Sequence, residues 1–550
     1  MADPAPRVTP PRPCAPHVHL EAHDHEQLAL EIRHAPGSAT AGGSHDVELF
    51  LFIPRNVGLM AANYPSADFY NDLTTYLRLD LPELGLEDLR ANTRSPLRML
   101  EVHLAELAQG QATPDWIGIA VKLFGHEFTE AVRRERKRLW SLIRAGTCHD
   151  TARPHEAAPP DRTWRRELMA GVHELATTSR SALERLREAK HKFSPFRRVA
   201  PDVWEVFQQT DEYTSLFLDD VLATLAHELC ARSELFDGSG WTTRVLHVLS
   251  TCAATEVEYR HTQGFINLEY TSATNREYFL YRRSLLKKAV QQALWVKTRR
   301  RQVDNYLRNA AGMVAAGMAA TWALIAQLPA RFFSLSPLAQ TLMFVLPVVA
   351  YIMKDRIKEV TKEWLIRRMR AYDQETELVG SQLAKSGLGS LRGTLREKVR
   401  FLDHAPDDVL SIRQRGRWIA GARIGGESVL VYRRKLEILA SPEDQPRTTD
   451  ELALRQIIRL NLRHFMTRLD ERDQFVRHYE PSIGGFATHE IAKVYHLNVV
   501  ARIGGPDQEA HLKRWRVVFS REGIERIESP CEASSPLASR SIGQHSRRSP

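Results

Sequence analysis

Two long apolar runs stand out from the rest of the chain, in which hydrophobic and polar residues are mixed. The first extends from Asn309 to Leu328 and the second from Ser334 to Met353, and neither contains a charged side chain. A helix of about 20 residues rises roughly 30 Å, the thickness of the hydrocarbon core of a bilayer. The pattern predicts a transmembrane helical hairpin over 309–353, and the alternative is a pair of helices buried in a large core.

Basic residues flank both runs. Nine lysines and arginines lie between Arg282 and Arg308 and seven between Lys354 and Arg370, whereas the connecting turn holds only Arg331. Since positive charge stays on the cytoplasmic side, we expect two membrane spans with both termini cytoplasmic. The expected partners are the lipid bilayer and, at the basic flanks, anionic lipid headgroups.

Small residues within the first run suggest close helix packing. Such residues let helix backbones approach each other in lipid. The packing partner would be the second helix or another copy of the protein, giving a homo-oligomer; alternatively, alanine serves here only as a good apolar helix former. The predicted membrane-packing residues are Ala311, Gly312, Ala315, Ala316, Ala319 and Ala323.

The rest of the chain predicts a mainly α fold with α+β portions, in which a largely helical N-terminal region and a smaller α+β C-terminal domain flank the hairpin. We expect a disordered Pro/His-rich tail (1–26), an α+β domain (27–145), a linker (146–162), a helical bundle and stalk (163–308), the hairpin (309–353), a cytoplasmic stalk helix (354–386), an α+β domain (387–528) and a disordered tail (529–550).

Strands and helices are distinguished by their periods of apolar residues. Residues 27–34 and 46–54 alternate and predict a β-hairpin, whose second strand would be buried on both faces. The stretch from Ser66 and residues 448–471 have helical spacing. Further helices are predicted at 95–109, 114–145, 163–192, 201–232, 241–262 and 274–308, and strands at 427–439, 495–503, 515–520 and near 524–528.

Composition adds few constraints. The chain has 550 residues, a net charge of +9 and five scattered cysteines without a CxxC pair, which argues against a disulfide framework and a zinc ribbon. The basic run RRERKR at 133–138 lacks interleaved aromatic residues, which disfavours nucleic acid as a partner.

Most catalytic templates are absent from the sequence. There is no GxxxxGK[ST] loop, no GxGxxG after a strand and no GxSxG elbow. Four His-Glu pairs begin like HExxH without the second histidine that zinc requires, at His126, His173, His227 and His489. The catalytic residues and any cofactor are therefore unknown, no cofactor-binding residue is indicated, and the sequence leaves open whether the protein is an enzyme.

The densest group of candidate metal ligands is a histidine tract. In an extended chain, alternation would place His17, His19, His23 and His25 on one side, where they could collect a divalent transition metal. The alternative is a polar tail or a solvent-facing edge strand. Asp219-Asp220 followed by His227-Glu228 could bind a cation or transfer protons, although helix surfaces carry such pairs routinely.

The stretch YPSADFYNDLTTYLRLDLPEL, the basic-flanked hairpin and the closing RVVFSREGIERIE resemble a group of uncharacterised bacterial two-span inner-membrane proteins with no assigned activity. The resemblance implies a membrane location and assigns no site residues. We therefore expect a membrane-anchored scaffold or regulatory protein that faces the cytoplasm and binds a protein partner. The alternative is a membrane-tethered enzyme with an unrecognised active site in its N-terminal region.

Overall fold

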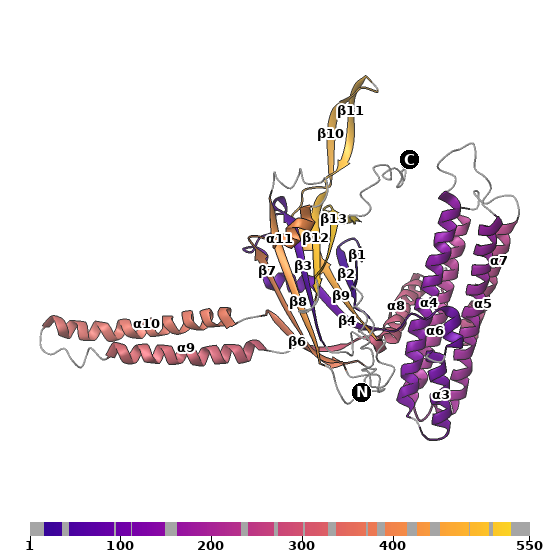
Figure 1. The fold of residues 1–550 in the computed structure, drawn as a ribbon, viewed down its shortest axis with the longest axis horizontal. Helices are drawn as coiled ribbons and strands as arrows, with labels where there is room; N and C mark the ends of the chain where they lie inside the picture. Colours follow the sequence, from indigo (N-terminus) through magenta and orange to yellow (C-terminus); the bar gives the residue numbers. More distant parts are fainter. Residues whose placement is uncertain are drawn as a thin grey trace, which may run out of the picture.

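A computed structural model of the chain describes most of its residues. The described ranges are 16–35, 43–92, 95–111, 113–148, 162–232, 240–268, 273–300, 303–327, 337–369, 372–381, 391–414, 426–439, 452–482, 484–504 and 510–529. They form a β domain from which a helical domain and a two-helix arm extend in opposite directions (Figure 1).

The β domain is built from two antiparallel sheets and a separate hairpin. The eight-stranded sheet has the order β14 (Ile524–Glu528), β13 (His511–Phe519), β12 (Tyr495–Gly504), β3 (Gly43–Pro54), β8 (Glu427–Leu439), β7 (Arg392–Leu402), β6 (Gln374–Gly380) and β5 (Lys297–Arg300). The four-stranded sheet has the order β1 (His17–Ala22), β2 (Gln27–Arg33), β9 (Ala453–Asn461) and β4 (Leu73–Asp80). The hairpin pairs β10 (Asp473–Glu480) with β11 (Gly485–Ala492).

Strand β3 lies in the middle of the larger sheet and is buried on both faces, as the sequence predicts. Leu49 and Leu51 belong to the core shared with the four-stranded sheet, in which Leu30 and Ile458 are also buried. On the other face, Phe50 joins a smaller core, which is covered by the short helix α11 (Asp407–Gln414). Burying alternate residues on both faces explains why this strand is almost continuously apolar.

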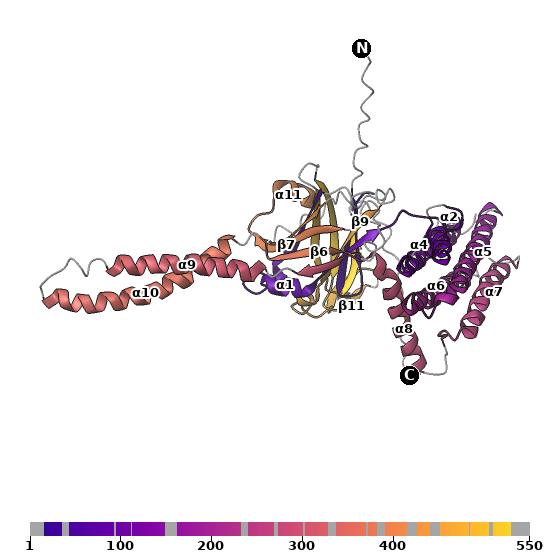
Figure 2. The same cartoon turned by 90° about the horizontal axis from the view of Figure 1, so that it is seen from below.

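The helical domain is a bundle whose long helices agree with the predicted ones. It comprises α2 (Leu86–Ala91), α3 (Pro96–Ala108), α4 (Pro114–Cys148), α5 (Arg162–Phe193), α6 (Pro201–Cys230), α7 (Trp241–Thr262) and α8 (Ala273–Gln291). Figure 2 views the bundle nearly along the axes of its long helices. In this view α8 lies between the other helices and the β domain. Aromatic and aliphatic side chains such as Phe124, Phe128 and Phe207 fill its core.

The helical domain is joined to the β domain through a shared apolar cluster. Leu77 and Leu79 of β4 pack with Ile119 and Leu123 of α4. The chain returns through the 3-10 helix η4 (Gln292–Leu294), after which the Val296 amide donates to the Leu77 carbonyl at 3.0 Å. The bundle therefore begins and ends beside the same strand.

Helices α9 (Val303–Gln327) and α10 (Pro337–Met369) lie side by side and form the arm (Figures 1 and 2). The predicted transmembrane hairpin is wrong: among the described residues, no helix is both long enough and apolar enough to cross a membrane. Alanine and glycine, which contribute little apolar area, dominate α9, and charged residues follow Lys354 in α10. The predicted inner-membrane location with two spans and cytoplasmic termini depended on that hairpin and is wrong with it.

The predicted fold class, mainly α with a transmembrane hairpin, is also wrong. Strands from the two ends of the chain share both sheets, because β3 lies between β8 and β12, and β9 lies between β2 and β4. The predicted hairpin of 27–34 with 46–54 does not form, since β2 pairs with β1 and β9. The stretch from Ser66 is helical only as α1 (Ser66–Asp72) and then continues as β4.

Two further elements differ from their predicted form. The predicted helix 448–471 contains strand β9 and a short helix, α13 (Arg463–Met466). Leu454, Ile458 and Leu460 are buried at alternate positions, as a strand requires, whereas the spacing of Leu454, Ile457 and Ile458 also fits one face of a helix. The predicted helix 274–308 ends at Gln291, before η4 and β5.

We expect Gly125→Ala to destabilise the protein by about 1–3 kcal/mol, the usual cost of overpacking. A Cβ at this position of α4 would lie 2.6 Å from Thr210 Cγ2 and 3.0 Å from Val290 Cγ1. Gly118→Ala on the same helix is the matched control, because its Cβ would meet Val203 at 3.5 Å. The control should be neutral or stabilising, since alanine favours helix. Urea unfolding measures both; equal effects would contradict the proposed close packing.

Candidate functional site

The most extensive group of buried polar residues lies around the middle of α6. Residues Thr210 to Leu216 are all buried, including Asp211 and Glu212. Seven consecutive residues make about two helical turns, so α6 is enclosed on every side at this level. A buried charge is tolerated only when it is paired and hydrogen-bonded, and α6 therefore depends on its neighbours for partners.

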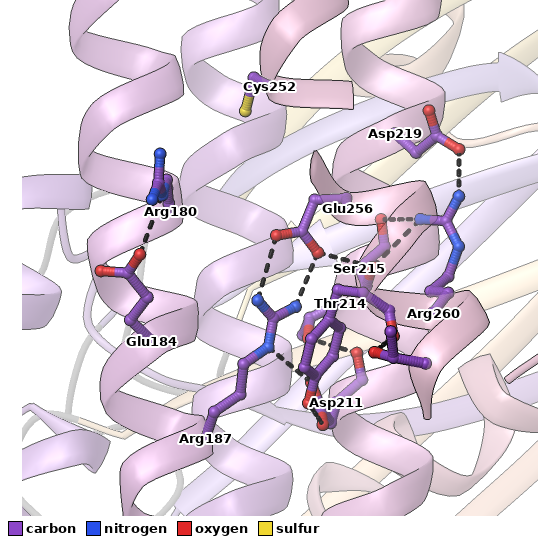
Figure 3. Close-up of polar contacts among 12 residues, drawn as sticks. Arg180, Glu184, Arg187, Asp211, Thr214, Ser215, Asp219, Cys252, Glu256 and Arg260 are labelled. Carbon is purple, nitrogen blue, oxygen red and sulfur yellow. Dashed lines mark hydrogen bonds and ion pairs between the residues drawn. The ribbon is translucent and has the colours of Figure 1, made fainter. Parts of the chain in front are cut away.

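Asp211 receives three hydrogen bonds from two neighbouring helices, and Figure 3 shows the one from Arg187. Lys190 and Arg187 of α5 approach its carboxylate at 2.8 Å and 3.2 Å, and the Tyr259 hydroxyl of α7 donates to it at 2.7 Å. The carboxylate has no exposed surface. It links α5 to α7 through α6.

Glu256 and Arg260 of α7 extend the network (Figure 3). Glu256 accepts hydrogen bonds from both terminal nitrogens of Arg187, at 2.7 Å and 3.2 Å, and from the Ser215 hydroxyl at 2.7 Å. Arg260 donates to the same hydroxyl at 3.1 Å and to Asp219 at 2.6 Å. Ser215 of α6 therefore joins the two halves of the network.

The network is electrically balanced. Its three carboxylates, Asp211, Asp219 and Glu256, face three cations, Arg187, Lys190 and Arg260. Burial opposes the charge of Arg187, but the bond to Glu256 and the charges of Glu256 and Asp211 together outweigh that effect and raise the pKa of the guanidinium. Burial and the Asp211 carboxylate raise the pKa of Tyr259. The Arg187 guanidinium and the Tyr259 hydroxyl therefore hold their protons firmly, which suits a structural link better than proton transfer.

The thiol nearest the network is not an activated nucleophile. Burial, and then Glu256, raise the pKa of Cys252 to about 11, so that it stays protonated at neutral pH and reacts slowly. A hollow between α6 and α7 is lined mainly by apolar residues such as Leu222, Leu246 and Ala253. Neither feature supports the enzyme hypothesis.

A second polar group lies where the helical domain meets the β domain. Arg78 of β4 points its Nη2 at His126 Nε2 of α4, 2.7 Å away. Since a guanidinium only donates, this ring nitrogen accepts. Burial, together with the Arg78 charge, holds the pKa of His126 well below its usual range. Burial also raises the pKa of Glu127 to about 7.

The structure separates the histidines of the predicted metal tract. His17 and His19 lie on the exposed face of β1, where His19 is 3.6 Å from the Glu21 carboxylate. The strand ends at Ala22, so His23 and His25 fall in the turn before β2. Within the described residues, no three donors of this tract lie within 4.8 Å of one another. Metal binding by the tract stays a prediction.

The six alanine and glycine residues predicted for packing fall into two groups. Ala311, Ala315 and Ala319 are fully buried on α9, which lies against α10. Ala323 is half-buried at the end of this row. Gly312 and Ala316 flank the row: Ala316 is exposed, and a Cβ added at Gly312 would meet no other atom within 4 Å.

The acidic residues noted in the sequence all have basic partners. Asp219 binds Arg260, and Asp220 accepts both terminal nitrogens of Arg283 at 2.7 Å and 3.3 Å. Glu228 pairs with Arg232 one turn further along. The structure therefore favours ordinary helix-surface ion pairs over a cation-binding or proton-transfer site. Sequence reasoning missed Asp211, whose signal was an acidic pair, Asp211-Glu212, within an apolar helix.

No protein-family model, no curated protein and no solved structure matches the chain. The chemistry of the site must therefore be argued from its own residues.

We expect Glu256→Ala to destabilise the helical domain by about 3–5 kcal/mol, because it leaves Arg187 buried without its bidentate partner. The exposed ion pair of Arg180 with Glu184, at 2.9 Å on α5, supplies the control (Figure 3). Glu184→Ala should cost less than about 1 kcal/mol. Chemical unfolding followed by circular dichroism compares the two; a similar small loss in both would show that the network contributes little.

We expect Glu127→Gln to stabilise the protein at alkaline pH. Burial raises the pKa of Glu127 to about 7 in the folded protein, whereas the pKa of a free glutamate side chain is 4.5. Between these values the folded state binds more protons, so stability falls as the pH rises, by roughly 3 kcal/mol in total. The variant should thus match the wild type near pH 4 and exceed it at pH 8.

Glu188→Gln is the control for this pH dependence, because Glu188 is exposed on α5. Its stability relative to the wild type should not change with pH. The measurement is the free energy of unfolding from urea titrations at several pH values. A pH-independent effect of Glu127→Gln would show that folding does not raise the pKa of Glu127.

Proposed function

We propose that this protein is a non-catalytic scaffold that self-associates through the arm formed by α9 and α10. One observation carries the proposal: large apolar side chains are exposed on both helices of the arm. Met313 is 71% exposed, Leu324 66% and Val348 59%. A helix that is hydrophobic all round is normally buried, and apolar patches of this kind mark interaction sites.

A second copy of the chain is the partner that fits this surface best. In a symmetric pair the apolar length of one arm meets an equal length of the other. Gly312 and the exposed Ala316 provide a strip of small residues beside the buried row of α9. Such a strip allows another helix to approach closely, because no side chain keeps the backbones apart.

The charges at the base of the arm also suit a homotypic contact. Lys354, Asp355 and Arg356 follow the apolar part of α10, and Arg356 lies 3.9 Å from Glu359. Mixed signs on one surface can complement the same surface of another copy, whereas a single sign would repel it. The ion network of the helical domain supports the non-catalytic part of the proposal, since each of its charges already has a partner.

The test is the mass of the full-length protein in detergent-free buffer, measured by light scattering after size exclusion. We expect a discrete dimer or larger oligomer. The double variant Met313→Glu/Leu324→Glu should be monomeric, because charges would be buried without partners. Val199→Glu/Leu280→Glu changes equally exposed apolar residues of the helical domain, 78% and 62% exposed, and should leave the oligomer intact.

Three outcomes would overturn the proposal. The wild type could be monomeric at all concentrations. Both double variants could shift the mass equally, which would indicate unspecific association. The protein could instead bind vesicles of neutral phosphatidylcholine as a monomer, so that lipid rather than a second copy covers the arm.

A further inference from the structure

The hairpin of β10 and β11 stands apart from the two large sheets. It projects beyond the end of the eight-stranded sheet (Figure 1), and almost all of its residues are exposed or half-buried. A two-stranded hairpin without a sheet or helix to pack on is only marginally stable in water. This hairpin therefore needs a further contribution to stay ordered.

One face of the hairpin brings two histidines and a glutamate together. His478 and Glu480 are two residues apart on β10 and so share a face. Their cross-strand partners are Ala487 and Gly485, whereas His489 is the partner of Val476 on the same face. Because Gly485 and Ala487 are small, the space above them is open to the side chains of His478, Glu480 and His489.

The three side chains converge there. His489 Nε2 lies 3.4 Å from Glu480 Oε2, and the His478 and His489 ring centroids are 4.9 Å apart. One ligand atom from each residue lies within 4.8 Å of the other two, and within the described part of the chain this is the one group of three such residues to do so. The Ser482 hydroxyl donates to the other carboxylate oxygen, Oε1, at 2.9 Å and orients it.

From this geometry we propose that His478, Glu480 and His489 form a site for a divalent transition-metal ion of the zinc class. Two imidazoles and a carboxylate are ligands that Zn²⁺ prefers, and water would complete the shell. Donors around tetrahedral zinc are separated by roughly 3.3 Å, given bonds of about 2.0–2.1 Å. Exposed side chains on neighbouring strands reach that spacing by small rotamer adjustments.

The ion would cross-link the two strands of the hairpin. His478 and Glu480 belong to β10 and His489 to β11, so a bound ion joins the two strands between the middle of the hairpin and its turn. The opposite face carries exposed aromatic side chains, Phe475, Tyr479 and Phe486, of which the last is 86% exposed. Tyr479 and Phe486 pack edge to face, with ring centroids 5.7 Å apart. Metal binding on one face thus orders the aromatic surface on the other.

The experiment is a Zn²⁺ titration of untagged, chelator-treated full-length protein against a chromophoric zinc indicator. His478→Ala and His489→Ala should each bind one equivalent of Zn²⁺ fewer than the wild type. Glu490→Gln is the matched control, since Glu490 is the next residue on β11 and faces the other way. This control should bind as the wild type does.

The N-terminal histidine tract needs its own control, because it could bind zinc independently. A variant with alanine at His17, His19, His23 and His25 should keep the equivalent that His478→Ala removes. If His478→Ala and His489→Ala bind as much Zn²⁺ as the wild type, the site does not exist.

Hydrogen exchange of the hairpin amides gives a second measurement that does not depend on stoichiometry. Zn²⁺ should slow exchange between residues 473 and 492 in the wild type and in Glu490→Gln, and leave exchange unchanged in His489→Ala. Binding without slower exchange in the wild type would overturn the cross-link between the strands.

Discussion

The fold depends on the position of β3 between β8 and β12. Phe50 of this N-terminal strand is opposite Val431 on one side and Val500 on the other, so the larger sheet is continuous only when both ends of the chain are present. The other elements are arranged around that pairing.

The helical domain and the arm are insertions between strands. The helical domain leaves after β4 and returns where the backbone of Arg78 forms a β-bridge with Trp295. The arm leaves after β5 and returns at β6, with Arg300 opposite Thr376. Each insertion thus begins and ends at neighbouring points of a sheet.

The polar interior of the helical domain determines how its helices align. Apolar packing tolerates small sliding movements of one helix along another, whereas a carboxylate such as Asp211 has bonding partners at only one axial position. Ser215 fixes the axial position of α6 in the same way, because its hydroxyl is hydrogen-bonded to both Glu256 and Arg260. Desolvating the charges opposes their attraction. The benefit of the network is therefore a unique arrangement of α5, α6 and α7 rather than additional stability.

Local patterns in the sequence predicted individual helices and strands better than they predicted which strands pair with each other. The long helices α4 to α7 and the strands β3, β8 and β12 follow from their periods. The class of the fold does not, because strand pairing depends on contacts between distant segments. In β9, Leu454 and Ile458 satisfy both a helical and an alternating pattern, and only pairing with β2 and β4 selects the strand. For the same reason the convergence of His478, Glu480 and His489 depends on the register of a hairpin that was not predicted.

The central place of β3 also constrains the order in which the protein can be made. Its neighbour β12 is synthesised close to the C-terminus, so β3 must stay unpaired on that side while the helical domain and the arm leave the ribosome. The helical domain contains mostly local contacts and can fold early, whereas the larger sheet must wait. During that interval β3 exposes an apolar edge of the kind that chaperones bind. Pairing of β3 with β12, rather than synthesis of any one segment, is then the step that completes the larger sheet.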